Sequence, residues 1–143
     1  NWLSCLTTLL LFVWYALSFI GIPGIIDSWF KEDVLWIVTA LSLLLPLPIA
    51  IWSYSKDHKY TDWMMLIITS SWAAIAYLGH WQWFFTLPTQ QKLTRYYQFF
   101  DSWYLIGPLP DRIIPDGYHL ILHLLISINL LLVIFRLIKR FRR

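Results

Sequence analysis

Residues 117–137 read GYHLILHLLISINLLLVIFRL, and this stretch decides the class of fold. A helix that crosses a lipid bilayer needs roughly 20 mostly apolar residues, and the stretch supplies them. Three others meet the same criterion, at residues 2–22, 34–54 and 63–87. The first of these is too long for the core of a typical signal peptide and has no basic flank, so we expect it to be retained as a helix. The sequence therefore predicts an all-α integral membrane protein, with four transmembrane helices in a single polytopic domain over residues 1–143.

The composition supports a lipid environment. The chain is 59% hydrophobic and 19% aromatic, but only 13% charged. Soluble domains carry about a quarter charged residues, so the polar residues here are too few to cover a water-exposed surface. A disordered segment is excluded as well, because it needs low hydrophobicity and high charge. Many of the ten Trp, including Trp81 and Trp83, fall at predicted span borders, which is typical of the aromatic belt at a bilayer interface.

The distribution of Lys and Arg predicts the orientation in the membrane. Five of the eleven basic residues lie in the C-terminal tail, residues 136–143. With four crossings, this tail shares one side with the loop at residues 55–62, and that side then holds seven Lys and Arg against four on the other. Because the richer side is normally cytoplasmic, we expect both termini to face the cytoplasm or an equivalent negative side. A basic tail of this kind suits anionic lipid headgroups. The rest of the sequence has no basic face, so a nucleic-acid partner is not expected.

The long third loop is predicted to contain an amphipathic helix at about residues 91–105. Its apolar side chains recur at helical spacing, with polar residues such as Arg95 and Gln98 on the opposite face. An aromatic-rich helix of this kind favours the headgroup plane of the bilayer, and the alternative is contact with a partner protein. The residues predicted to contact lipid or a partner are Tyr96, Tyr97, Phe100, Trp103 and Tyr104 of this segment, with Arg136, Lys139 and Arg140 of the tail.

Three histidines are the candidate functional residues. His80 lies about seven residues inside the outer border of its span, and His123 lies about six residues inside the same border of the last span. His119 is one helical turn shallower than His123 and shares its face. If the third and fourth spans are neighbours, the three imidazoles meet at one level of the membrane. Ionisable groups at that depth are costly and mark functional sites by default.

Three hypotheses fit this cluster. In the first, His80 and His123 are axial ligands of a b-type haem between the two helices, or one of them ligates a chlorophyll-type pigment. In the second, His80, His119 and His123 form a metal site with an open position, which Asp111 and Asp116 assist as orienting groups or as a base. In the third, the histidines are structural and bond to backbone carbonyls, headgroups or neighbouring helices.

Two further polar or irregular features lie within the spans. Pro46 and Pro48 remove backbone N–H groups and should kink or open the second span. A packing kink is the favoured explanation, and a lipid- or quinone-binding site at the opened helix is the alternative. Asn129 is predicted to form a hydrogen bond between helices.

The leading functional hypothesis is a small non-catalytic subunit or accessory factor of a larger membrane complex. Respiratory and photosynthetic electron-transfer assemblies are natural hosts, with other integral membrane subunits as partners. The sequence has no Gly-rich phosphate loop, no nucleophile elbow, no CxxC and no pair of intramembrane carboxylates, which disfavours an enzyme. The alternative is a small integral membrane metalloenzyme that acts on a lipid-like substrate through the three-histidine site.

Overall fold

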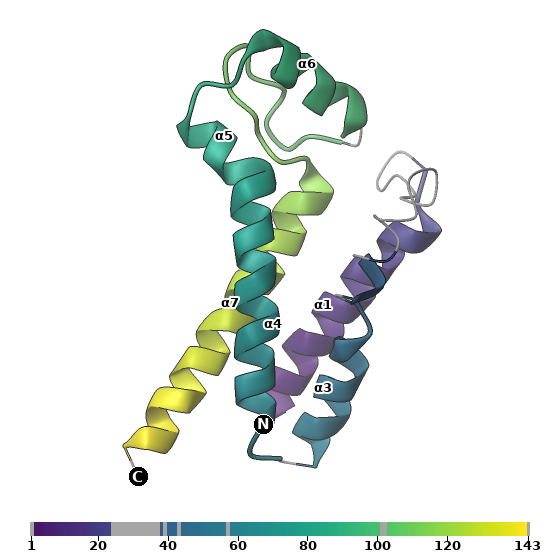
Figure 1. Cartoon of the computed structure of the whole chain (residues 1–143). Coiled ribbons are helices and arrows are strands. Elements are labelled where there is room, and N and C mark those ends of the chain that lie inside the picture. Colours follow the sequence, from purple (N-terminus) through teal and green to yellow (C-terminus); the bar gives the residue numbers. More distant parts are fainter. Residues whose placement is uncertain are drawn as a thin grey trace.

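A computed structural model describes residues 2–23, 38, 40–42, 44–56, 58–100 and 103–142. These residues form helices and contain no strand, which confirms the all-α class. The elements are α1 (Trp2–Ile20), α3 (Pro46–Ser55), α4 (Thr61–Ala76), the π-helix η2 (Tyr77–Trp81), α5 (Gln82–Phe85), α6 (Gln90–Phe99) and α7 (Gly117–Phe141). In Figure 1, both chain ends lie at the same end of the bundle, while α5 and α6 lie at the other.

The four helices of the bundle, α1, α3, α4 and α7, each pack against two of the others. α7 packs against both α4 and α1, and α3 packs against α1 and α4. α1 ends where Gly21 adopts a positive φ of 73° and its N–H bonds to Leu17 O at 2.9 Å, a helix end that favours glycine. α7 begins where the Asp116 carboxylate accepts from His119 N at 2.8 Å, so this acidic side chain caps the helix. The predicted start of the last span at Gly117 is therefore confirmed.

The helices bury polar groups together with apolar ones and leave many large apolar side chains exposed. On α7, His119, His123 and Asn129 are buried, whereas Leu131 and Phe135 are 67% and 65% exposed. α1 shows the same arrangement, since its buried residues include four Ser and Thr side chains. A helix on the surface of a water-soluble bundle has the reverse distribution. Two described helices, α1 and α7, are long and apolar enough to cross a membrane.

The other two predicted spans are not regular α-helices along their whole length. The stretch from Thr61 to Phe85 is helical without a gap, but the π-helix η2 divides it into shorter segments. In the second span, α3 begins afresh at Pro46 after a turn at Leu45, so the predicted irregularity at the prolines is present. Proline is tolerated in the first helical turn, where its missing N–H has no helical partner to lose. Residues 34–37, 39 and 43 of that predicted span lie outside the described residues.

The amphipathic helix of the third loop differs from the prediction at its C-terminal end. α6 ends at Phe99, so the expected boundary at residue 105 is wrong, and Trp103 and Tyr104 lie outside the helix. The chain turns back at Phe100 because the following loop folds against α6. The Tyr97 hydroxyl donates to Arg112 O at 2.8 Å and accepts from Leu109 N and Ile114 N at 3.3 and 3.2 Å.

The contacts predicted for this helix with lipid or a partner also differ from those observed. Leu93 and Tyr96 on its apolar face are buried together with Ile113, and Tyr97 and Phe100 pack against that cluster. Trp103 lies against Gly117, where a Cβ atom would come within 2.2 Å of the indole ring. The apolar face of α6 thus covers the end of the bundle.

Two of the three tail residues predicted to contact lipid or a partner instead contact the bundle. α7 continues as a helix to Phe141, and Arg136 Nε lies 2.8 Å from Asp62 Oδ1. Arg140 lies 3.3 Å from the other oxygen of the same carboxylate. Because Asp62 is fully buried, it needs paired cations close by. Lys139 is exposed and remains available for contact with a headgroup or a partner.

The predicted role of Asn129 is confirmed, and it leads to a stability prediction. Its Oδ1 accepts from the hydroxyls of Thr7 and Thr8 at 3.1 and 3.0 Å, and its Nδ2 donates to Thr7 O at 3.1 Å.

Asn129→Ala is expected to lower the free energy of unfolding by about 2 kcal/mol, because buried partners on α1 are left unsatisfied. Thermal unfolding in detergent measures this loss. Ser127→Ala is the control, since Ser127 bonds only to His123 O of its own helix, and an equal loss there would contradict the prediction.

Candidate functional site

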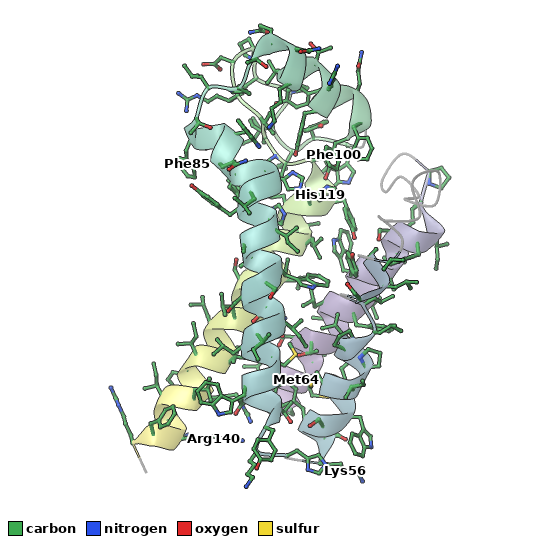
Figure 2. All side chains as sticks on the ribbon, in the orientation of Figure 1. Lys56, Met64, Phe85, Phe100, His119 and Arg140 are labelled. Carbon is green, nitrogen blue, oxygen red and sulfur yellow. The ribbon has the colours of Figure 1, made fainter. Side chains whose placement is uncertain are left out.

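A cavity of about 480 Å³ lies beneath α6, between α1, α4 and α7. The histidine cluster lies at the polar, outer end of the cavity, which is the end nearest α6. Figure 2 shows His119 and Phe100 at this end, where α7 begins. The lining residues are Tyr15, Ala40, Trp72, Ile75, Ala76, Gly79, His80, Lys92, Arg95, Tyr96, Phe99, Phe100, His119, Leu122, His123 and Ile126. Its volume falls in the range of small-molecule binding sites.

The three imidazoles come together as the sequence predicts. The ring centroid of His80 lies 4.6 Å from that of His119 and 5.0 Å from that of His123, and His119 and His123 are 6.1 Å apart. His80 belongs to the π-helix η2, whose wider turn also exposes Gly79 to the cavity. Single π-turns inside α-helices are frequent at functional sites. The three imidazoles, expected to meet from their positions in the sequence, do lie in contact, whereas their depth in a membrane stays a prediction.

Each histidine has a different partner at Nδ1. The Asp116 carboxylate lies 2.8 Å from His119 Nδ1, and the Tyr96 hydroxyl is hydrogen-bonded to His80 Nδ1. The indole N–H of Trp81 donates to His123 Nδ1 at 3.0 Å. Because an indole nitrogen only donates, Nδ1 of His123 is the unprotonated nitrogen of that ring. In the neutral imidazole, Nε2 of His123 then carries the proton and is a hydrogen-bond donor.

This arrangement gives the metal and haem hypotheses no support. Within the described residues, no group of three or more His, Cys, Asp or Glu side chains is placed to hold a metal ion. A metal binds the lone pair of an imidazole nitrogen, whereas Nδ1 of His123 is occupied by Trp81 and Nε2 carries the proton. The rings of His80 and His123 also contact one another directly, where a haem would have to separate them. Ligation of a metal, haem or pigment by these histidines stays a prediction from the sequence.

Aromatic side chains of α6 cover the cluster. Phe100 lies 5.2 Å from His80 and 4.8 Å from His119, between ring centroids. Tyr96 is buried, and this burial, with the Asp116 carboxylate as a smaller cause, raises the pKa of its phenol. The phenol therefore keeps its proton at neutral pH. The histidines are thus held in an aromatic, hydrogen-bonded setting at one end of the cavity.

Several site residues could not be identified from the sequence. Trp81 was expected in the interfacial belt, but its indole N–H orients His123. The one signal for this role is that a half-buried indole N–H needs a hydrogen-bond acceptor. Arg95, expected on the outward face of α6, lines the cavity together with Lys92. Asp111 pairs with Arg112 at 3.7 Å on the surface. Pro46 and Pro48 are not among the residues that line the cavity.

Comparison with known protein families, curated proteins and solved structures finds no match for this chain. The site itself must therefore carry the functional argument.

Proposed function

We propose that this chain is a small membrane-embedded protein that binds one lipid-like amphiphile in the cavity. The observation that carries the proposal is the division of the cavity into two chemically different parts. Trp72, Ile75, Leu122 and Ile126 line it with apolar groups, and the histidine cluster lies at its outer end. An apolar tail would occupy the first part, and a head with oxygen acceptors would face the second.

A four-span membrane topology supports this role. The outward apolar faces of α1 and α7 suit lipid, and the gap-free helical stretch from Thr61 to Phe85 is long enough to be a third crossing. The second crossing would combine α3 with the segment before it. An even number of crossings fits the position of both chain ends at one end of the bundle in Figure 1. Seven basic residues near those ends favour a cytoplasmic location for both termini.

Hydrogen bonding would select the head of the ligand. The Nε2–H of His123 is a donor without a partner among the described residues, because the one hydrogen bond of its ring there is made through Nδ1. A carbonyl, ester or phosphate oxygen would satisfy it, whereas a purely apolar ligand would leave a buried donor unpaired, at a cost of about 1–3 kcal/mol. Binding of this kind needs no catalytic group, and it is compatible with a role as a subunit among other integral membrane proteins.

Binding of 1-lauroyl glycerol to the full chain, purified in dodecyl maltoside, tests the proposal. We expect saturable binding of one molecule per chain, measured by native mass spectrometry across a concentration series. His123→Leu is expected to raise the dissociation constant about tenfold, because one buried hydrogen bond to the head is lost.

His58→Leu is the matched control. His58 is exposed, and its ring contacts Trp52 in a part of the chain remote from the cavity lining. Its affinity for 1-lauroyl glycerol should equal that of the parent chain. Unsaturable binding, or equal weakening by the two substitutions, would contradict the proposal.

A further inference from the structure

The basic residues at the cavity indicate the charge of the ligand. We infer that the bound amphiphile carries an anionic head, of the phosphate monoester class, which Arg95 recognises beside the histidine cluster. This inference rests on the proposed function and adds to it the chemical class of the head group.

The lining of the cavity is asymmetric in charge. Lys92 and Arg95 both line it from α6, and His80, His119 and His123 face them from the bundle. Of the described residues that line the cavity, none is acidic. The nearby carboxylate of Asp116 is bonded to His119 at both the backbone N–H and Nδ1, each at 2.8 Å. Two cations, Lys92 and Arg95, thus outweigh the one nearby carboxylate at this end of the cavity, and the balance of charge favours an anion.

The two basic residues are held differently. The ammonium group of Lys92 lies 3.0 Å from the ring centroid of Trp83, a cation–π contact with a residue that does not line the cavity, so Lys92 adds positive charge near the cavity without directing its ammonium group at the ligand. Arg95 makes no hydrogen bond or ion pair with any other described residue. A cation without a partner beside an apolar cavity is suited to bind an anionic ligand. Arg95 is one helical turn from Phe99, so its side chain lies on the part of α6 that closes the cavity.

The chemistry of guanidinium and imidazole groups fits a phosphate. A guanidinium presents paired N–H groups that match two oxygens of one phosphate, and such charge-assisted bonds are stronger than neutral ones. The N–H of His123 would meet a further oxygen of the same head or of its ester link. The acyl or isoprenoid tail would then enter the apolar part of the cavity. Charge, hydrogen bonding and shape favour the same ligand class.

A matched pair of ligands tests the inference. 1-Lauroyl lysophosphatidic acid and 1-lauroyl glycerol share a chain and a glycerol and differ only in the phosphate. For the parent chain, we expect the phosphate ligand to bind at least about tenfold more tightly, with a preference that shrinks as salt is added. Arg95→Gln should remove most of this preference and leave the affinity for 1-lauroyl glycerol unchanged. Arg95 is exposed, so the substitution spares the core.

Lys139→Gln is the control for the loss of one positive charge. Lys139 is exposed on the last turns of α7, far along the chain from the cavity lining, and its replacement should leave the preference intact. Equal affinity of the parent chain for the two ligands would overturn the inference, as would an equal effect of both substitutions. If 1-lauroyl glycerol binds without any preference for phosphate, only this inference fails. If neither ligand binds, the proposed function fails as well.

Inorganic phosphate separates two sources of the same anion. Displacement of the phosphate ligand by millimolar inorganic phosphate would support recognition of the free anion. Retention of the ligand would support recognition of a lipid headgroup, in which the tail supplies part of the binding energy.

Discussion

Gly79→Phe is expected to weaken binding of 1-lauroyl glycerol by nearly two orders of magnitude while the protein remains folded. Gly79 lines the cavity, and a Cβ atom added there meets nothing within 4 Å. A phenylalanine ring therefore has room to enter the cavity and would displace the apolar tail of the ligand. If it removes roughly 100 Å² of apolar contact, binding weakens by about 2.5 kcal/mol, which is nearly a hundredfold. Titration followed by native mass spectrometry measures the change.

Gly107→Phe is the matched control for this substitution. Gly107 also has open space around its Cβ position, but it is absent from the cavity lining. Its replacement should leave the affinity unchanged, and circular dichroism should show equal helix content in both variants. Undiminished binding by a folded Gly79→Phe protein would place the ligand outside this cavity.

Asp62→Ala is expected to give the largest loss of stability. Asp62 is fully buried and lies within 4 Å of two cations, Arg136 at 2.8 Å and Arg140 at 3.3 Å. Removing the carboxylate leaves Arg136, whose side chain is only 19% exposed, without its counter-ion. Breaking a buried pair in this way typically costs about 3–5 kcal/mol. Chemical or thermal unfolding in detergent measures the effect.

An exposed ion pair provides the comparison. Asp111 and Arg112 are 57% and 40% exposed and lie 3.7 Å apart, so Asp111→Ala should cost no more than about 1 kcal/mol. Removing the closest pair, as Asp62→Leu with Arg136→Met, should recover much of the stability, because the cation that remains, Arg140, is 36% exposed and can be solvated. Equal losses in the two single variants would show that Asp62 is not a central stabilising residue.

The histidine cluster could be predicted from helical rise together with the assumption that the third and fourth predicted spans are neighbours. His80 and His123 lie at similar distances from the predicted ends of those spans, and the packing of α4 on α7 brings them to one level of the bundle. Asn129 was predictable for a related reason, since an amide within an apolar helix needs a partner on another helix. Both inferences use the periodicity of a helix and the cost of burying a polar group.

The contacts of α6 and of the tail could not be predicted, because they depend on how chain segments distant in sequence pack. The apolar face of α6 satisfies the pattern of a helix that lies on a bilayer, yet it packs on the loop that contains Ile113. Similarly, Arg136 fits the pattern of a juxtamembrane cation, but Asp62 on α4 lies within reach of it. Amphipathic pattern and charge give the face of a helix but not its partner.

Mapping the binding site by photo-crosslinking tests the central claim most directly. A lauroyl glycerol with a diazirine near the end of its chain would be bound to the full chain, irradiated, and the labelled residues identified by mass spectrometry. We predict that labels concentrate on Trp72, Ile75, Leu122 and Ile126, and that Gly79→Phe removes them. Labels spread over outward residues such as Ile67 and Phe135, with no change in Gly79→Phe, would contradict a ligand in the cavity.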